Sequence, residues 1–230
     1  YEVYQGTAGV NRFFPHSEKM FEVKPDLGSV VFKRWPALVF CQTPIDVALD
    51  LVPRIGDPSS IDRIDVKTYE MCVNIGASDG AWSPDSRAVR THSLPYCVAC
   101  ALAKGSIAYQ DFDEPFANDP TLNALMAKVS VAEDPSMTAA FPAKSACEIR
   151  VTRKDGTQET AARDRPHGDP ADPMSDGEIE DKLRTNVFIA DAGEAATVIG
   201  RCSAARARTH RATSVALSAR LPANGDASAV

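Results

Sequence analysis

The clearest constraint on the fold is a predicted β-hairpin in the second half of the chain. Apolar and polar residues alternate over 147–152, the dipeptide Asp155-Gly156 follows, and a second run returns over 158–162. An Asp-Gly pair between such runs is typical of a two-residue hairpin turn, because glycine reaches the positive φ that the turn requires. The chain is therefore expected to contain paired antiparallel strands.

Three further segments are predicted to be strands. Residues 61–69 alternate between apolar and charged side chains, which indicates a half-buried strand. Ser29–Phe32 is a short apolar, β-prone run, and Val129–Val131 is another.

The predicted helices are marked by their capping residues. Ser93 is placed to cap a nearly all-apolar helix over Leu94–Lys104, which ends at Gly105 and should be buried. Three more helix starts are indicated by Thr43-Pro44, by Asp119-Pro120 and by the capping box Ser175-x-x-Glu178. The stretch Trp82–Arg90 is polar and is predicted to be turn-like. Together these elements predict an α+β fold, a two-layer sandwich of short, mostly antiparallel strands with flanking helices.

Charge and composition exclude several function classes. The chain has 230 residues and a net charge of −6, which argues against a nucleic-acid partner because such a partner requires a basic face. No apolar run reaches the ~18–20 residues of a membrane span, and no signal peptide is recognisable at Tyr1. We therefore expect a cytoplasmic protein with no membrane partner.

The cysteines and the short motifs argue against a metal or nucleotide site. Six cysteines in a chain of this length without a secretory signal are expected to be reduced thiols. Cys97 and Cys100 form a C-x-x-C without a second pair at ligand spacing, so we interpret them as small apolar residues on a buried helix face. Glycine-rich phosphate-binding motifs are absent.

His92 and Tyr96 are the leading catalytic candidates. His92 precedes the predicted helix cap, where partial positive charge at a helix N-terminus favours neutral imidazole and binds anions. Tyr96 follows four residues later, so both side chains would face one cleft if the turn is helical. A phenol there can donate a hydrogen bond to developing negative charge. The alternative is structural: a capping histidine and an interior tyrosine with a satisfied hydroxyl.

Lys33 and Arg87 are candidate substrate-binding residues. Lys33 follows the apolar run at 29–32 and precedes Trp35-Pro36, and beside a pocket it would pair with a substrate carboxylate. Arg87, like Arg90, is a possible carboxylate clamp. Each of these cations could equally be a solvated surface charge.

Several short segments, in order along the chain, resemble the MmgE/PrpD family of 2-methylcitrate dehydratases and their relatives. The segments that carry the resemblance are Phe32–Pro36, Gln42–Leu49, Trp82–Arg87, His92–Tyr96, Leu125–Val129, Val131–Pro135, Asp155-Gly156 and Pro173–Ser175. Each segment alone is weakly specific, but their order and spacing are specific.

The resemblance implies a fold, an activity and site residues. The chain would be the family's α+β lid domain over 29–173, without the N-terminal all-helical domain. An irregular entry segment over 1–28 would precede it. A returning helix over 174–200 and a disordered tail over 201–230 would follow.

By the same resemblance, Lys33 matches the family's substrate-binding lysine, and His92 and Tyr96 match its His-Ser-x-x-Tyr segment. The family is typically dimeric and works without metal or organic cofactor. One departure is Thr91, which stands where an acidic residue often precedes the histidine.

Three hypotheses of function follow. The first is a hydro-lyase of propionate metabolism that dehydrates a small hydroxy-tricarboxylate, by proton abstraction α to a carboxylate and loss of hydroxide. The second is the decarboxylation of cis-aconitate or the epimerisation of iminodisuccinate. The third is a catalytically inactive fragment or subunit. A homodimer, or association with a helical N-terminal half, is the expected assembly.

Overall fold

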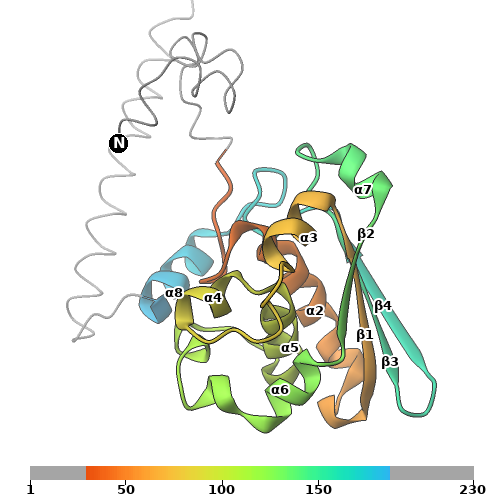
Figure 1. Ribbon diagram of the computed structural model, residues 1–230. Helices are drawn as coiled ribbons and strands as arrows, with labels where there is room; N and C mark the ends of the chain where they lie inside the picture. The colour runs from red at the N-terminus through yellow and green to blue at the C-terminus, as the bar shows by residue number, and fades with distance from the viewer. Residues whose placement is uncertain (1–29, 187–230) are drawn as a thin grey trace, which may run out of the picture.

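A four-stranded sheet forms one side of the protein in the computed structural model, which describes residues 30–186 (Figure 1). The strands are β1 (Ile61–Thr68), β2 (Val129–Glu133), β3 (Cys147–Arg153) and β4 (Gln158–Arg163), in the order β2-β1-β3-β4. β1 pairs parallel with β2 and antiparallel with β3, and β3 pairs antiparallel with β4. The predicted α+β fold with mostly antiparallel strands is thus confirmed, as is the hairpin at Asp155-Gly156.

Helices form the second layer, with α2 and α5 next to the sheet (Figure 1). The helical elements of the described residues are η4 (Val39–Cys41), α2 (Gln42–Ile55), η5 (Pro58–Ser60), α3 (Glu70–Gly76), α4 (Arg87–His92), α5 (Leu94–Lys104), η6 (Tyr109–Phe112), η7 (Phe116–Asn118), α6 (Pro120–Met126), α7 (Pro135–Ala140) and α8 (Asp176–Asn186). Within residues 30–186, no helix is both long and apolar enough to cross a membrane.

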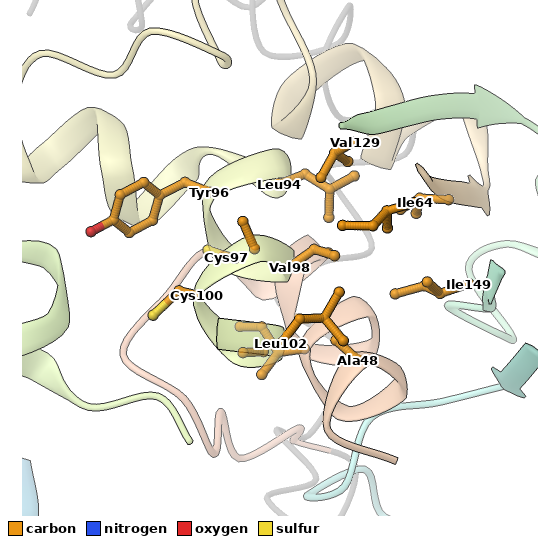
Figure 2. Close-up of a cluster of buried hydrophobic side chains, with 14 of the residues drawn as sticks. Ala48, Ile64, Leu94, Tyr96, Cys97, Val98, Cys100, Leu102, Val129 and Ile149 are labelled. Atoms are coloured by element: carbon orange, nitrogen blue, oxygen red, sulfur yellow. The ribbon is translucent and has the colours of Figure 1, made fainter. Parts of the chain in front are cut away.

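The core lies between α5 and the sheet. Leu94 and Val98 of α5 lie toward Ile64 of β1 and Ile149 of β3, as Figure 2 shows. All of these side chains are fully buried, and each contributes about 1.5–3 kcal/mol through removal of apolar surface from water. As predicted, Ser93 caps α5 by accepting from the Tyr96 N–H at 3.1 Å.

Three predictions of local structure are wrong. Residues 30–32 form no strand, because Phe32 has a single backbone hydrogen bond, from its N–H to Gly168 O at 2.9 Å. Helix α2 begins at Gln42, one residue before the predicted cap Thr43. The end of the polar stretch is helical rather than turn-like, because the hydroxyl of Ser86 accepts from the Val89 N–H and starts α4.

The predicted domain boundaries are only partly within the described residues. Helix α8 begins where the returning helix over 174–200 was expected, and the Ser175–Glu178 capping box is present, with Ser175 N–H donating to Glu178 Oε2 at 2.9 Å. The predicted entry segment over 1–28 and tail over 201–230 lie outside the described residues.

Candidate functional site

The segment that carries Lys33, residues 32–38 (the Lys33 segment), has irregular backbone and is held by residues far away in the sequence. Phe32 donates its N–H to Gly168 O at 2.9 Å, and the ammonium group of Lys182 on α8 donates to the Lys33 carbonyl. The Lys33 side chain is exposed, and its ammonium group contacts Ala37 O at 3.3 Å. The backbone around Lys33 is therefore fixed, while the charged group remains at the surface.

Gln42, at the first turn of α2, organises the residues that follow Lys33. Its buried side chain accepts from the Trp35 N–H at 2.9 Å through Oε1. Its Nε2 lies 3.1, 3.2 and 3.3 Å from the carbonyl oxygens of Trp35, Ala37 and Leu38. A buried amide that is satisfied on both atoms fixes the loop, because an unpaired polar group there would cost about 1–3 kcal/mol.

The same loop lies against the junction between α4 and α5. Leu38 donates its N–H to Thr91 O at 2.8 Å, directly before His92, the last residue of α4. This hydrogen bond joins the loop that follows Lys33 to the residue before His92, although Lys33 and His92 are 59 positions apart in the sequence.

The imidazole of His92 is exposed and anchored through one nitrogen. Nδ1 lies 2.8 Å from Ala88 O and 3.0 Å from the Thr91 hydroxyl, which itself donates to Ala88 O. A carbonyl only accepts, so Nδ1 carries a proton and Nε2 is the nitrogen available for proton transfer. His92 directly precedes Ser93, the cap of α5, as expected, and its Nδ1 contacts a carbonyl of α4.

Tyr96 and His92 do not share a cleft in the described structure. Ser93 between them is extended, with φ −82° and ψ 113°, so the helical spacing of four residues does not apply across it. Tyr96 is buried and its hydroxyl donates to Asp111 O at 2.5 Å. Burial raises the pKa of the Tyr96 phenol, which keeps it protonated and able to donate.

Tyr96 instead lines a pocket of about 390 Å³ on the other side of the α4–α5 junction. The pocket is formed by Trp82, Ser83, Pro84, Tyr96, Ala117, Asn118, Asn123, Met126 and Ala127. The indole N–H of Trp82 donates to Val129 O at 3.0 Å, which fixes the ring at the pocket wall.

Arg87 is engaged within the protein through Nη2 and the face of its guanidinium group, although its buried Nε has no hydrogen-bond partner among the described residues. Its Nη2 donates to Tyr109 O at 2.8 Å and lies 3.1 Å from Asp113 Oδ2, and its Cζ lies 3.4 Å from the centre of the Tyr109 ring. These contacts hold α4 against η6. A substrate carboxylate would have to replace Asp113 in order to bind this guanidinium group.

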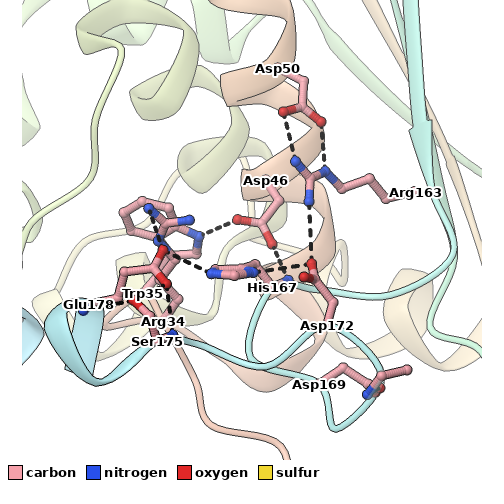
Figure 3. Close-up of polar contacts among 11 residues, drawn as sticks. Arg34, Trp35, Asp46, Asp50, Arg163, His167, Asp169, Asp172, Ser175 and Glu178 are labelled. Carbon is pink, nitrogen blue, oxygen red and sulfur yellow. Dashed lines mark hydrogen bonds and ion pairs between the residues drawn. The ribbon is translucent and has the colours of Figure 1, made fainter.

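A polar cluster around His167, not predicted from the sequence, lies beside the Lys33 segment (Figure 3). The imidazole lies between two carboxylates, with Nε2 2.9 Å from Glu178 Oε1 and Nδ1 3.1 Å from Asp172 Oδ2. The backbone N–H of His167 donates to Asp46 Oδ2 at 2.8 Å, and Asp46 also accepts from the Trp35 indole at 2.8 Å.

Arginines complete this cluster. Arg163 forms a two-point contact with Asp50, at 2.6 and 2.8 Å, and Arg34 lies 3.8 Å from Glu178. Burial raises the pKa of the Asp46 carboxyl, although two hydrogen bonds oppose that shift. The only sequence signal for the cluster was the capping box that contains Glu178, since the partners of His167 come from separate elements.

The cysteines of the described residues are buried free thiols, namely Cys41, Cys72, Cys97, Cys100 and Cys147. The predicted burial of Cys97 and Cys100 on one helix is therefore confirmed. Among residues 30–186, no group of three or more His, Cys, Asp or Glu side chains has the geometry to hold a metal ion.

Residues 35–203 match the model of the MmgE/PrpD C-terminal domain. The chain belongs to the MmgE/PrpD family. This membership agrees with the resemblance seen in the sequence and with the α+β lid described above, and the described residues contain no all-helical domain.

Curated members of the MmgE/PrpD family carry two different names. The chain is 30% identical to the 2-methylcitrate dehydratase of Escherichia coli K12 over 139 residues, which are 56% of this chain and 28% of that protein. It is 33% identical to the cis-aconitate decarboxylase of Homo sapiens over 162 residues, 70% of this chain and 34% of that protein. The chain thus spans about a third or less of the length of these relatives.

Proposed function

We propose that this chain provides the lid of a cytoplasmic 2-methylcitrate dehydratase-like lyase that acts on a small hydroxy-tricarboxylate. Membership in the MmgE/PrpD family supports a lyase. The observation that carries the proposal is the hydrogen bond from Leu38 N–H to Thr91 O, since it joins the loop that follows Lys33 to the residue before His92. Both side chains are exposed, and a cation and an open imidazole nitrogen at one site would suit a carboxylate substrate that exchanges protons.

In this proposal the side chains have separate roles. Lys33 binds a substrate carboxylate, and His92 in its imidazolium form donates the proton on Nε2 to the departing hydroxide, which leaves as water. A base outside the described residues removes the proton α to a carboxylate, and the carbon–carbon double bond forms. Arg87 binds a second carboxylate by exchanging Asp113 for the substrate, while Tyr96 keeps its hydrogen bond to Asp111 O and lines the neighbouring pocket.

Activity of the chain joined to a helical domain tests this proposal. The chain is fused to, or expressed with, the helical domain of a 2-methylcitrate dehydratase, and alkene formation is followed by ultraviolet absorbance. Lys33→Met and His92→Gln are each expected to lower kcat/KM by about 100-fold, because misplaced or missing contacts at a reacting centre have effects of that size. Lys144→Met, which alters an exposed ion pair with Asp164, is the matched control and should retain activity. Absence of turnover in a correctly folded fusion would refute the proposal.

A decarboxylase is the second candidate function. It is supported by the similarity to the human cis-aconitate decarboxylase, which extends over 70% of this chain. Incubation with 2-methylcitrate and with cis-aconitate side by side, with detection of the alkene and of released carbon dioxide, separates the two. Turnover of cis-aconitate alone would establish the second candidate.

The apolar surface beside His92 supports an interaction with a helical domain or a second copy of the chain. Val39, Met71, Ile75 and Val89 are between 40% and 45% exposed. Met71 and Ile75 lie on α3, which packs against η4, and the end of α3 at Gly76 approaches His92 O. An exposed group of large apolar side chains is typical of an interface. A stable monomer of the isolated chain by light scattering would count against this assembly, and against the third hypothesis of a fragment that aggregates alone.

A further inference from the structure

We propose that His167 is a positioning residue that holds the Lys33 segment in place as an imidazolium clamp between Asp172 and Glu178. The proposal deepens the proposed function, since it rests on Lys33 as a carboxylate-binding group. It assigns a role to a histidine that the proposed function does not use.

The geometry around His167 places a carboxylate beside each ring nitrogen. Nε2 is hydrogen-bonded to Glu178 Oε1 at 2.9 Å, and Nδ1 lies at ion-pair distance from Asp172 Oδ2, at 3.1 Å. Carboxylates only accept hydrogen bonds, and a neutral imidazole has a single N–H. The imidazolium form pairs with both carboxylates, whereas in the neutral form one nitrogen lone pair would face a carboxylate.

Several charged groups surround the ring. The side chain of His167 is only 17% exposed, so solvent screens its two ion pairs weakly. The charged groups that face it or its partners come from α2, the Lys33 segment, β4, the following loop and α8, and they are Asp46, Asp50, Arg34, Arg163, Asp172 and Glu178. Each of the two arginines is paired with a carboxylate, so the ring meets negative charge on both sides.

The clamp reaches Lys33 through three connections. Gly168, the next residue after His167, accepts the Phe32 N–H through its carbonyl at 2.9 Å. Glu178 lies 3.8 Å from Arg34, and Lys182, one turn further along α8, donates to the Lys33 carbonyl. His167 thus connects the loop that contains Gly168 with helix α8. These two elements are hydrogen-bonded to the backbone of Phe32 and Lys33.

Gly168 lies in close backbone contact with Phe32. Its φ is +103°, and a Cβ at this position would lie 2.1 Å from Phe32 O. The loop approaches the Lys33 segment at backbone contact distance, so a shift of the His167 ring is transmitted to the residue that precedes Lys33 rather than absorbed by side chains.

Imidazole NMR and amide exchange on the complete chain test the clamp without any assay of activity. In the folded protein the two ring nitrogens of His167 should both show the chemical shifts of protonated nitrogen. In His167→Gln, the exchange protection of the Phe32 amide should fall by about tenfold to a hundredfold, because a charge-assisted contact is lost. The protection of the Val151 amide in β3 should not change.

Two further variants keep the test decisive. Glu178→Gln retains the shape of the side chain and the capping box, so it should fold and should still lower the protection of the Phe32 amide. Asp164→Asn removes an exposed ion pair with Lys144 and should leave that protection unchanged. An unprotonated ring nitrogen in the folded protein, or wild-type protection of Phe32 in both His167→Gln and Glu178→Gln, would overturn the clamp.

Kinetics then separate the clamp from general stability. In the active fusion, His167→Gln should raise KM for the tricarboxylate by about tenfold or more while kcat changes less, because the ring orders a binding residue and touches no reacting atom. An equal fall in kcat with unchanged KM would contradict a positioning role. If the wild-type fusion shows no turnover, the proposed function fails, and the NMR and exchange results still decide whether the clamp exists.

Discussion

The β3–β4 hairpin and the Lys33 segment achieve order in opposite ways. The hairpin pairs neighbouring residues, such as Ile149 with Ala161, across a turn at Asp155-Gly156. The Lys33 segment has no paired strand, and its hydrogen bonds go to Gly168, Lys182 and the junction at Thr91. One region is ordered by local sequence, and the other is ordered only when distant parts of the chain are already in place.

This difference separates stability from the placement of the candidate site. Substitutions in the sheet should change the free energy of unfolding, since they remove buried apolar contacts. Substitutions in the loop that precedes α8 should mainly change the position of Lys33. The following predictions test that separation, beginning with the largest expected effect.

Ile149→Ala should lower the free energy of unfolding by about 2–5 kcal/mol, because it leaves a cavity among fully buried side chains of β1, β3 and α5. Chemical denaturation measures the change. At temperatures where the variant remains folded, the hydrogen-exchange protection of the Phe32 amide, relative to that of neighbouring amides, should match the wild type. A loss of protection confined to Phe32 would remove the distinction between the two regions.

Gly168→Ala should lower the free energy of unfolding by about 1–3 kcal/mol, because alanine is strained at positive φ and its Cβ would collide with Phe32 O. Here the amide of Phe32 should lose protection before the hairpin does. Gly156→Ala, at a positive φ in open space, is the matched control and should leave Phe32 unaffected. Equal effects of the two substitutions on Phe32 would contradict the prediction.

Ser93→Ala should cost about 0.5–2 kcal/mol, because it removes the cap of α5 and the hydrogen bond from Ser93 Oγ to Ala81 O at 2.6 Å. Thermal denaturation measures the change. Ser136→Ala, which removes an exposed hydroxyl hydrogen-bonded to Asp134, is the control and should have a smaller effect. Equal losses of stability in the two variants would show that the Ser93 cap stabilises the junction of α4 and α5 no more than an exposed hydroxyl does.

The smallest effect is expected from acid. The hydrogen bonds from the N–H and hydroxyl of Ser175 lower the pKa of the Glu178 carboxyl to about 2. Since the folded pKa is depressed below the unfolded value of about 4.3, this stabilisation is complete above that pH and is lost as the pH falls toward 2. The side chain is 35% exposed, so solvent limits the effect. The free energies of unfolding of wild type and Glu178→Gln, measured by denaturation, should approach each other as the pH falls through this window. A difference that stays constant with pH would refute the assignment.

Local signals were sufficient to predict much of the scaffold, although α4, which carries Arg87 and His92, was expected to be turn-like. The alternation over 61–69 gave β1, Asp155-Gly156 gave the hairpin, and Ser93 and Gly105 gave both ends of α5. In each case the information lies within a few neighbouring residues, which is what periodicity and capping report.

The site itself depends on contacts that no local pattern records. Ser29–Phe32 has the composition of a strand, but the described part has no strand beside it, and Phe32 pairs only with Gly168. His92 and Tyr96 have helical spacing, but Ser93 ends one helix and begins the next. The contacts of His167 could not be predicted from the sequence, because its partner Asp46 is 121 positions away.

The five buried thiols of the described residues can also report on local opening of the folded chain. Burial raises the pKa of the Cys72 and Cys100 thiols to about 12, so neither reacts as a thiolate near neutral pH while the protein is folded. Each lies in a different helix, α3 and α5. Alkylation of the two sites would therefore record separate opening events, and the order of labelling would show which of the two helices opens first.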